Sequence, residues 1–125
     1  MAHWFVLIGA LMGGLSVAAG AFGAHALAAQ LSEKALSSFE TGARYQMYHA
    51  LGLVAVGLAI QTVGDSSLFS ATGILFIAGI IFFSGSLYVL SLTGVKILGA
   101  VAPIGGLAFM AGWVCLAIAG WSAMR

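Results

Sequence analysis

Residues 68–92 read LFSATGILFIAGIIFFSGSLYVLSL and contain no charged side chain. A hydrocarbon core about 30 Å thick is crossed by roughly 20 residues of α-helix, because each residue adds about 1.5 Å. In lipid only a helix or a closed barrel satisfies every backbone N–H and C=O group. This stretch therefore predicts a membrane-spanning helix.

Three further stretches have the same apolar character. The chain has only four basic and three acidic residues among 125, and 62% of its residues are hydrophobic, whereas soluble domains are about a quarter charged. We expect residues 1–125 to form a single transmembrane domain of the all-α class, an integral membrane four-helix bundle with short loops. The predicted spans are about 4–24, 43–63, 67–92 and 97–124.

The segment between the first two spans is the only polar one of any length. Ser32 suits an N-cap, Glu33 suits a first helical turn, and apolar residues recur on one face from 31 to 39. We expect a short amphipathic interfacial helix at about 32–41, lying on the membrane surface. The chain would then turn into the membrane at 41–42.

Small residues recur every three or four positions in the first and fourth spans. In lipid such stripes let helix backbones approach closely, which supplies van der Waals packing. We expect the two stripes to pack within the chain, with a seam between subunits as the alternative. They consist of Gly9, Gly13, Ser16, Gly20 and Gly23 in the first span, and of Gly105, Ala108, Gly112, Cys115 and Ala119 in the fourth.

Pro103 is the only proline. Proline is tolerated best in the first turn of a helix, and 103–122 is long enough to cross the membrane. The fourth helix is therefore expected to begin at Pro103, with 97–102 as a non-helical approach. The alternative is a kinked helix that runs through Pro103 and frees the carbonyl of Gly99.

Four alternating spans would bring distant polar residues into one leaflet. Polar groups inside a membrane are costly unless they face each other or water, so we expect them to form a polar cluster or a small open cavity. The candidate binding residues are His25, Tyr45, Gln46, His49, Ser84, Ser86 and Tyr88.

Several motifs in this order resemble the bacterial YgdD/YwdK-like inner-membrane proteins, a family of unassigned function related to eukaryotic transmembrane protein 256. The resemblance covers nearly the whole chain. It implies four transmembrane helices in a bacterial inner membrane, and no reaction, substrate or catalytic residue. The motifs are GAFGAHAL (20–27), TGARYQMYH (41–49), FSGSLY (83–88), PIGG (103–106) and GW (112–113).

The two histidines near one interface allow a haem hypothesis, with His25 and His49 as axial ligands. Against it, the glycine stripe of the first span favours close helix contact over a wide haem slot. Tyrosine, glutamine and serine are also poor metal ligands. We therefore expect no cofactor and no metal site, and expect both histidines to be hydrogen-bonded within the protein.

Two further function classes lack their usual signals. Carriers use charged groups at mid-membrane and internal repeats, and neither occurs here. An oligomeric small-solute or ion channel or transporter remains the alternative. For catalysis there is no Ser, His and acid arrangement, no HExxH motif and no phosphate loop, so we expect no enzyme and no catalytic residues.

The sequence favours a structural or binding accessory component of the membrane. The expected partners are membrane lipids, a second copy of the chain in a homo-oligomer, or a larger membrane complex, and no nucleic acid because the net charge is only +1. Charge counting places Lys34, Arg44 and Lys96 inside and hence both termini outside. The family resemblance implies the reverse, and we expect multi-pass insertion with cytoplasmic termini.

Overall fold

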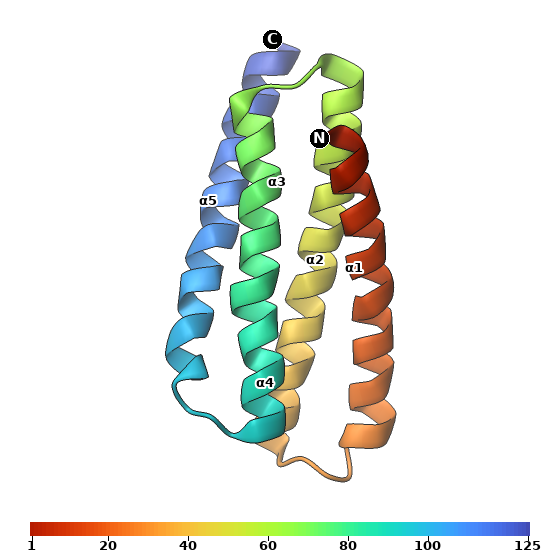
Figure 1. The fold of residues 1–125 in the computed structure, drawn as a ribbon, viewed down its shortest axis with the longest axis vertical. Helices are drawn as coiled ribbons and strands as arrows, with labels where there is room; N and C mark the ends of the chain where they lie inside the picture. The colour runs from red at the N-terminus through yellow and green to blue at the C-terminus, as the bar shows by residue number, and fades with distance from the viewer.

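A computed structural model describes residues 1–125 as an all-α bundle (Figure 1). Two short π-helical segments, η1 and η2, continue α1 and join α3 to α4. The elements are α1 (Ala2–Phe22), η1 (Gly23–Leu27), α2 (Glu33–Val63), α3 (Ser67–Gly79), η2 (Ile80–Gly85), α4 (Ser86–Thr93) and α5 (Leu98–Met124).

Four continuous helical segments are long and apolar enough to cross a membrane, as the sequence predicts. They run over Ala2–Leu27, Glu33–Val63, Ser67–Thr93 and Leu98–Met124. Neighbouring segments run in opposite directions, so the connections after η1 and after α4 lie at one end of the bundle, with both chain termini toward the other (Figure 1). We call these the loop end and the terminal end.

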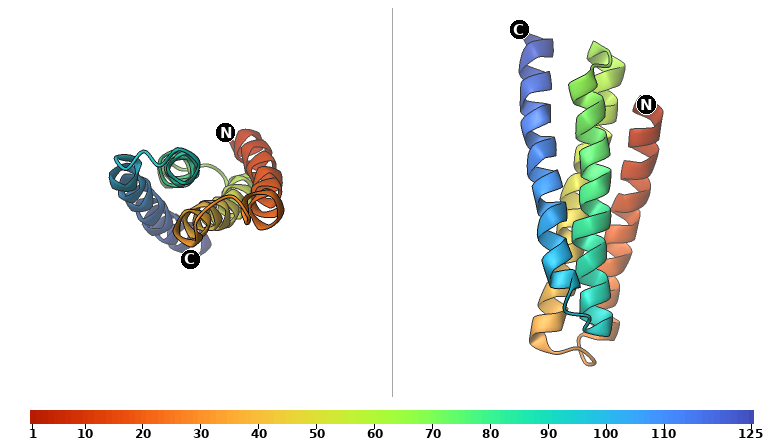
Figure 2. Two further views of the ribbon diagram at one scale, coloured as in Figure 1. Left: turned by 90° about the horizontal axis from the view of Figure 1, so that it is seen from below. Right: turned by 60° about the vertical axis from the view of Figure 1, so that its left-hand side comes forward.

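The four segments are not packed equally. α1 packs along α2, α5 packs along α3 and η2, and α2 meets α5 at few residues. Figure 2 shows α1 and α5 on opposite sides of the bundle. A cleft lined by residues of α2, η2 and α5 lies between α2 and α5.

The predicted separate interfacial helix is wrong. Ser32 does cap a helix, accepting a hydrogen bond from the backbone N–H of Ala35 at 3.1 Å, but that helix is α2, which continues unbroken to Val63. The expected turn at 41–42 does not form because Gly42 is needed as a helical contact. A Cβ there would lie 3.1 Å from the ring of Tyr88 and 3.2 Å from the carbonyl of Ser84.

The fourth helix also begins earlier than Pro103. α5 starts at Leu98, after its N-cap Ile97, and holds Pro103 inside it, so 98–102 is helical rather than an irregular approach. The helix tolerates Pro103 because this residue lies in the second turn, where it leaves only the backbone carbonyl of Gly99 without its usual hydrogen-bond donor. The alternative interpretation, a helix running through the proline, describes the backbone.

Phenylalanine rings that enter glycine notches form much of the core. The Phe5 ring of α1 lies against Gly73 of α3, and the Phe109 ring of α5 lies against Gly79. Phe76 is fully buried between glycines of two other helices, Gly52 and Gly112. Each notch places a large ring against backbone, which supplies dispersion contact that lipid tails cannot match.

The two small-residue stripes do not pack on each other. The stripe of α1 faces α2, where a Cβ at Gly9 would lie 2.7 Å from the carbonyl oxygen of Ala50. The stripe of α5 faces the third span, where Gly105 meets the backbone of Phe83 and Gly112 meets Phe76. Packing is therefore within the chain.

The α1 stripe is tight only in part. Gly23 lies against the ring of Phe39, and Ser16 is buried. A Cβ at Gly13 would make only ordinary contacts at 3.9 Å, and one at Gly20 would have no neighbour within 4 Å. The expectation that Gly20 requires close approach is therefore wrong.

Candidate functional site

Two polar networks involve neighbouring turns of α2, and the first links three helices. Gln46 donates from Nε2 to the backbone carbonyl of Met12 on α1 at 2.8 Å. Its Oε1 accepts from the hydroxyl of Tyr88 on α4 at 2.6 Å. Gln46 is buried, so both ends of its amide are satisfied without water. This network is a clasp between α1, α2 and α4.

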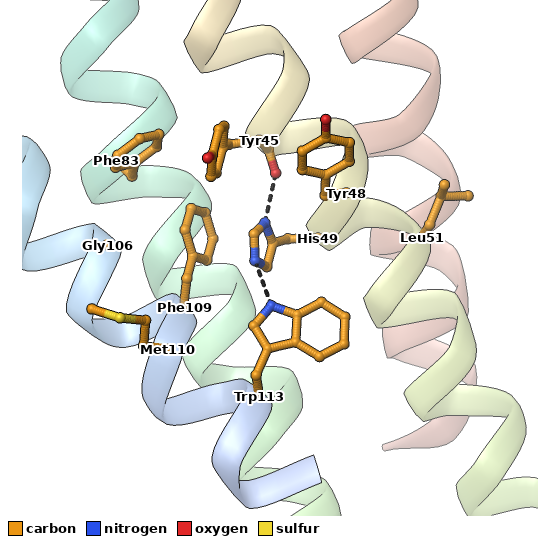
Figure 3. Close-up of a pocket in the computed structure, with 9 residues that line it drawn as sticks. All are labelled: Tyr45, Tyr48, His49, Leu51, Phe83, Gly106, Phe109, Met110 and Trp113. Carbon is orange, nitrogen blue, oxygen red and sulfur yellow. Dashed lines mark hydrogen bonds between the residues drawn. The ribbon is translucent and has the colours of Figure 1, made fainter. Parts of the chain in front are cut away.

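The second network centres on His49 and links α2 to α5 (Figure 3). The imidazole Nδ1 lies 2.7 Å from the backbone carbonyl oxygen of Tyr45. The indole Nε1–H of Trp113 donates to Nε2 at 2.9 Å. The imidazole stacks on the ring of Phe109, with centroids 3.5 Å apart and planes 8° apart. His49 is thus held by two hydrogen bonds and a parallel ring.

The partners of His49 define its protonation state. An indole N–H can only donate, so Nε2 of His49 is the accepting, unprotonated nitrogen. Nδ1 then carries the hydrogen and donates to the carbonyl of Tyr45. His49 is a neutral imidazole in one tautomer, with no free lone pair.

The structure brings together some of the predicted site residues and separates others. Gln46 and Tyr88 share one network, while Tyr45 and His49 belong to the other. His25 lies in η1 and is exposed, so its predicted place in the cluster is wrong. His25 points away from the bundle because Gly23 and Leu27 occupy the buried face of η1.

The two candidate site serines of the third span, Ser84 and Ser86, are buried in its loop-end half. Ser84 is wholly buried, and its hydroxyl has no hydrogen-bond partner. Ser86 is buried as well. Neither of them reaches His49, whose two nitrogens bond to Tyr45 and Trp113, so the structure contains no serine–histidine pair.

A cavity of about 700 Å³ opens beside His49 in the cleft between α2 and α5. Figure 3 shows aromatic rings on both of its sides. Its outer lining is half exposed on the surface of the bundle, including Tyr48, Met110 and Trp113. The lining residues are Tyr45, Tyr48, His49, Leu51, Phe83, Gly106, Phe109, Met110 and Trp113.

Sequence reasoning missed the α5 side of this site. Trp113 and Phe109 read as ordinary apolar residues of a span. A signal was present, since a tryptophan near the middle of a span, away from the interfacial belt, needs an acceptor for its N–H. No feature of the sequence predicts that the backbone carbonyl of Met12 accepts a hydrogen bond from Gln46.

The arrangement favours binding over chemistry. His49 cannot ligate a metal or a haem iron without losing the bond from Trp113, and His25 lies elsewhere. No three His, Cys, Asp or Glu side chains gather into a metal-binding group. What the site offers a ligand is a mainly apolar, aromatic surface that includes the rings of Tyr45 and Tyr48.

Comparison with known proteins identifies the family. Residues 19–106 match the family model described as "Protein of unknown function (DUF423)". A UPF0382 membrane protein of Staphylococcus haemolyticus is 50% identical over 91% of this chain and 92% of its own. UPF0382 membrane protein YwdK of Bacillus subtilis is 44% identical over 92% of this chain and 94% of its own. No solved structure matches. The chain therefore belongs to the DUF423 family of membrane proteins, whose function is unassigned.

Proposed function

We propose that the protein is a lipid-binding accessory component of the bacterial membrane, and that a membrane lipid occupies the cleft between α2 and α5. The observation that carries the proposal is the cavity of about 700 Å³ beside His49, lined mainly by aromatic and aliphatic side chains. Pockets of a few hundred Å³ with this lining suit apolar ligands. No chemical step is part of the proposal, because both nitrogens of His49 are already bonded.

The position of the cavity along α2 supports a lipid. α2 has 31 residues, about 46 Å at 1.5 Å per residue, so it is longer than a hydrocarbon core of about 30 Å. Its charged residues all precede Tyr45, whereas 45–63 is uncharged. Tyr45 and Tyr48 then lie at the level where tyrosines of membrane proteins gather. The cavity extends from that level toward the membrane interior.

The direction in which the cavity opens also supports a lipid as the ligand. Leu51 and Met110 at its rim are 61% and 58% exposed, on surfaces that face acyl chains in a bilayer. A ligand would enter from the bilayer rather than from water. An acyl chain fits this route because it is already dissolved in the surrounding phase.

Quenching of Trp113 by a brominated lipid tests the proposal. In a protein with Trp4→Phe and Trp121→Phe, Trp113 is the only indole, and it lines the cavity. Titration of brominated phosphatidylcholine into detergent micelles should quench Trp113 saturably, at about one lipid per protein. A protein that keeps only Trp121, which is 74% exposed on the same helix, should show quenching proportional to the lipid-to-detergent ratio. Identical, unsaturable curves for both would contradict the proposal.

We also propose the inner membrane as the location, with both termini in the cytoplasm. The bacterial sources of the relatives support the location, and the family resemblance supports the orientation of the termini. A fluorescent protein fused after Arg125 should then fluoresce, and alkaline phosphatase at the same position should be inactive. The reverse pattern would support the charge count, which puts the three basic residues of the loop end inside.

A further inference from the structure

A second, polar pocket of about 570 Å³ lies at the loop end of the bundle. It is bounded by the first turns of α2, the last turn of α4 and the connection to α5. Lys34 and Lys96 reach it from two of these segments, and none of its nine lining residues is acidic. The lining is Ser32, Lys34, Ala35, Ser38, Leu90, Ser91, Gly94, Lys96 and Gly99.

The polar pocket and the cavity beside His49 lie on one line. On each of three helical segments, a residue that lines one pocket is seven residues from a residue that lines the other. Seven residues are about two helical turns along one face. On α5 the wall passes from Gly99 to Gly106, and on the third span from Leu90 to Phe83. On α2 it passes from Ser38 to Tyr45. The two pockets therefore lie along the same helix faces, about 10 Å apart along the helix axes.

We infer that the cleft holds one lipid with an anionic phosphate headgroup. The phosphate would lie between Lys34 and Lys96, and an acyl chain would extend into the cavity beside His49. This inference rests on the proposed function and adds the class of lipid. The offset of about 10 Å matches an amphiphile whose charge is at the membrane surface and whose chain is below it.

Charge complementarity selects a net negative headgroup. A lysine ammonium is a compact charge that suits phosphate oxygens. The hydroxyl of Ser32 uses its oxygen as an acceptor for the N–H of Ala35, so its own hydrogen remains free to donate to a phosphate. A zwitterionic headgroup would also bring an ammonium group, and this pocket has no carboxylate to pair with it.

The test compares lipids in the protein whose only indole is Trp113. Brominated phosphatidylglycerol and brominated phosphatidylcholine are titrated in the same detergent, and the ratio of their apparent dissociation constants measures the headgroup preference. We expect the unaltered site to prefer phosphatidylglycerol, and Lys34→Gln with Lys96→Gln to reduce that preference on the order of tenfold. Melting temperatures confirm that each variant is folded.

A matched control separates the pocket from diffuse attraction. Arg44→Gln with Arg125→Gln changes the net charge equally, but neither residue lines the polar pocket, so the preference should persist. An equal loss in this control, or no loss in the lysine variant, would overturn the inference. Quenching by phosphatidylcholine is unchanged in either case if the proposed function holds, so failure of the headgroup inference is distinguishable from failure of lipid binding.

A free anion must also be distinguished from a lipid. Inorganic phosphate added to the loaded protein should not relieve the quenching by phosphatidylglycerol more than sodium chloride of equal ionic strength does. Selective displacement by inorganic phosphate would show a site for a soluble ion, and the inference would be wrong.

Discussion

Gly105 and Gly106 are neighbours on α5, yet they serve two different regions of the molecule. Gly105 faces η2, where a Cβ would collide with the backbone of Phe83. Gly106 faces the cleft, where a Cβ would lie 3.8 Å from the ring of Phe83 in ordinary contact. One glycine closes a seam between helices, and the next keeps a cavity open.

This contrast shows that glycine content alone does not report packing in a membrane bundle. The seam between α5 and η2 is tight because its two backbones touch, and η2 is itself a π-helical segment at this contact. π-Bulges of this kind recur at functional sites. The cleft between α2 and α5 is instead spanned by the bond from Trp113 to His49, which fixes its width while leaving space beside it.

The largest expected effect is at the seam. Gly105→Ala should destabilise the protein by about 3 kcal/mol, because a Cβ against backbone cannot be relieved by a side-chain rotation. Gly106→Ala is the matched control and should be neutral or stabilising by up to about 1 kcal/mol, since alanine favours helix. Thermal melts in detergent compare the two. Equal melting temperatures would remove the distinction between seam and cleft.

The hydrogen bond across the cleft should contribute less. His49→Phe keeps the stacking on Phe109 but leaves the N–H of Trp113 without an acceptor, at a cost of about 2 kcal/mol. Trp113→Phe leaves Nε2 of His49 unpaired in the same way. The double variant should be more stable than the sum of the two losses predicts, by about 1 kcal/mol. Strict additivity in the melts would mean that this bond does not hold the cleft.

The clasp of Gln46 with Met12 and Tyr88 should contribute about 1 kcal/mol. Tyr88→Phe removes the donor to Gln46 and leaves its Oε1 buried without a partner. Tyr48→Phe removes a hydroxyl from a half-exposed tyrosine and is the matched control, with an expected change within about 0.5 kcal/mol. Equal losses in the two variants would indicate that the clasp adds nothing to stability.

The smallest effect is expected at the open end of the α1 stripe. Gly20→Leu should not lower the free energy of unfolding, because a Cβ at this position has no neighbour within 4 Å and leucine favours helix over glycine. Gly9→Leu, on the same stripe, should be strongly destabilising against the carbonyl of Ala50. A large loss at Gly20 would show that this face is covered in the membrane, for example by a second copy of the chain.

Much of the fold is predictable from the sequence. Uncharged length fixes the four spans, and alternation places Gln46, His49 and Tyr88 in one half of the bundle. The boundary of the second span was mistaken because Thr41 and Gly42 resemble a turn in isolation. Only the tertiary contact of Gly42 with Tyr88 shows why the helix continues, which is the usual way in which packing overrides local preference.

The site is less predictable than the fold. Periodicity shows which residues share a helix face, but not how far each helix is rotated toward its neighbours. That rotation decides that His49 faces Trp113, that Gln46 faces Met12, and that His25 faces outward. The glycine stripes have the same ambiguity, since Gly9 and Gly20 look alike in the sequence and differ only in what lies opposite them.

Native mass spectrometry of the protein purified in mild detergent tests the central claim, that the cleft between α2 and α5 holds a lipid. Gly106→Leu places a side chain in the cavity, whereas Gly14→Leu makes the same change at an exposed position with no neighbour within 4 Å. We predict that the unaltered protein and Gly14→Leu retain one lipid, and that Gly106→Leu is folded and lipid-free. A folded Gly106→Leu protein that retains its lipid as fully as Gly14→Leu would contradict the claim.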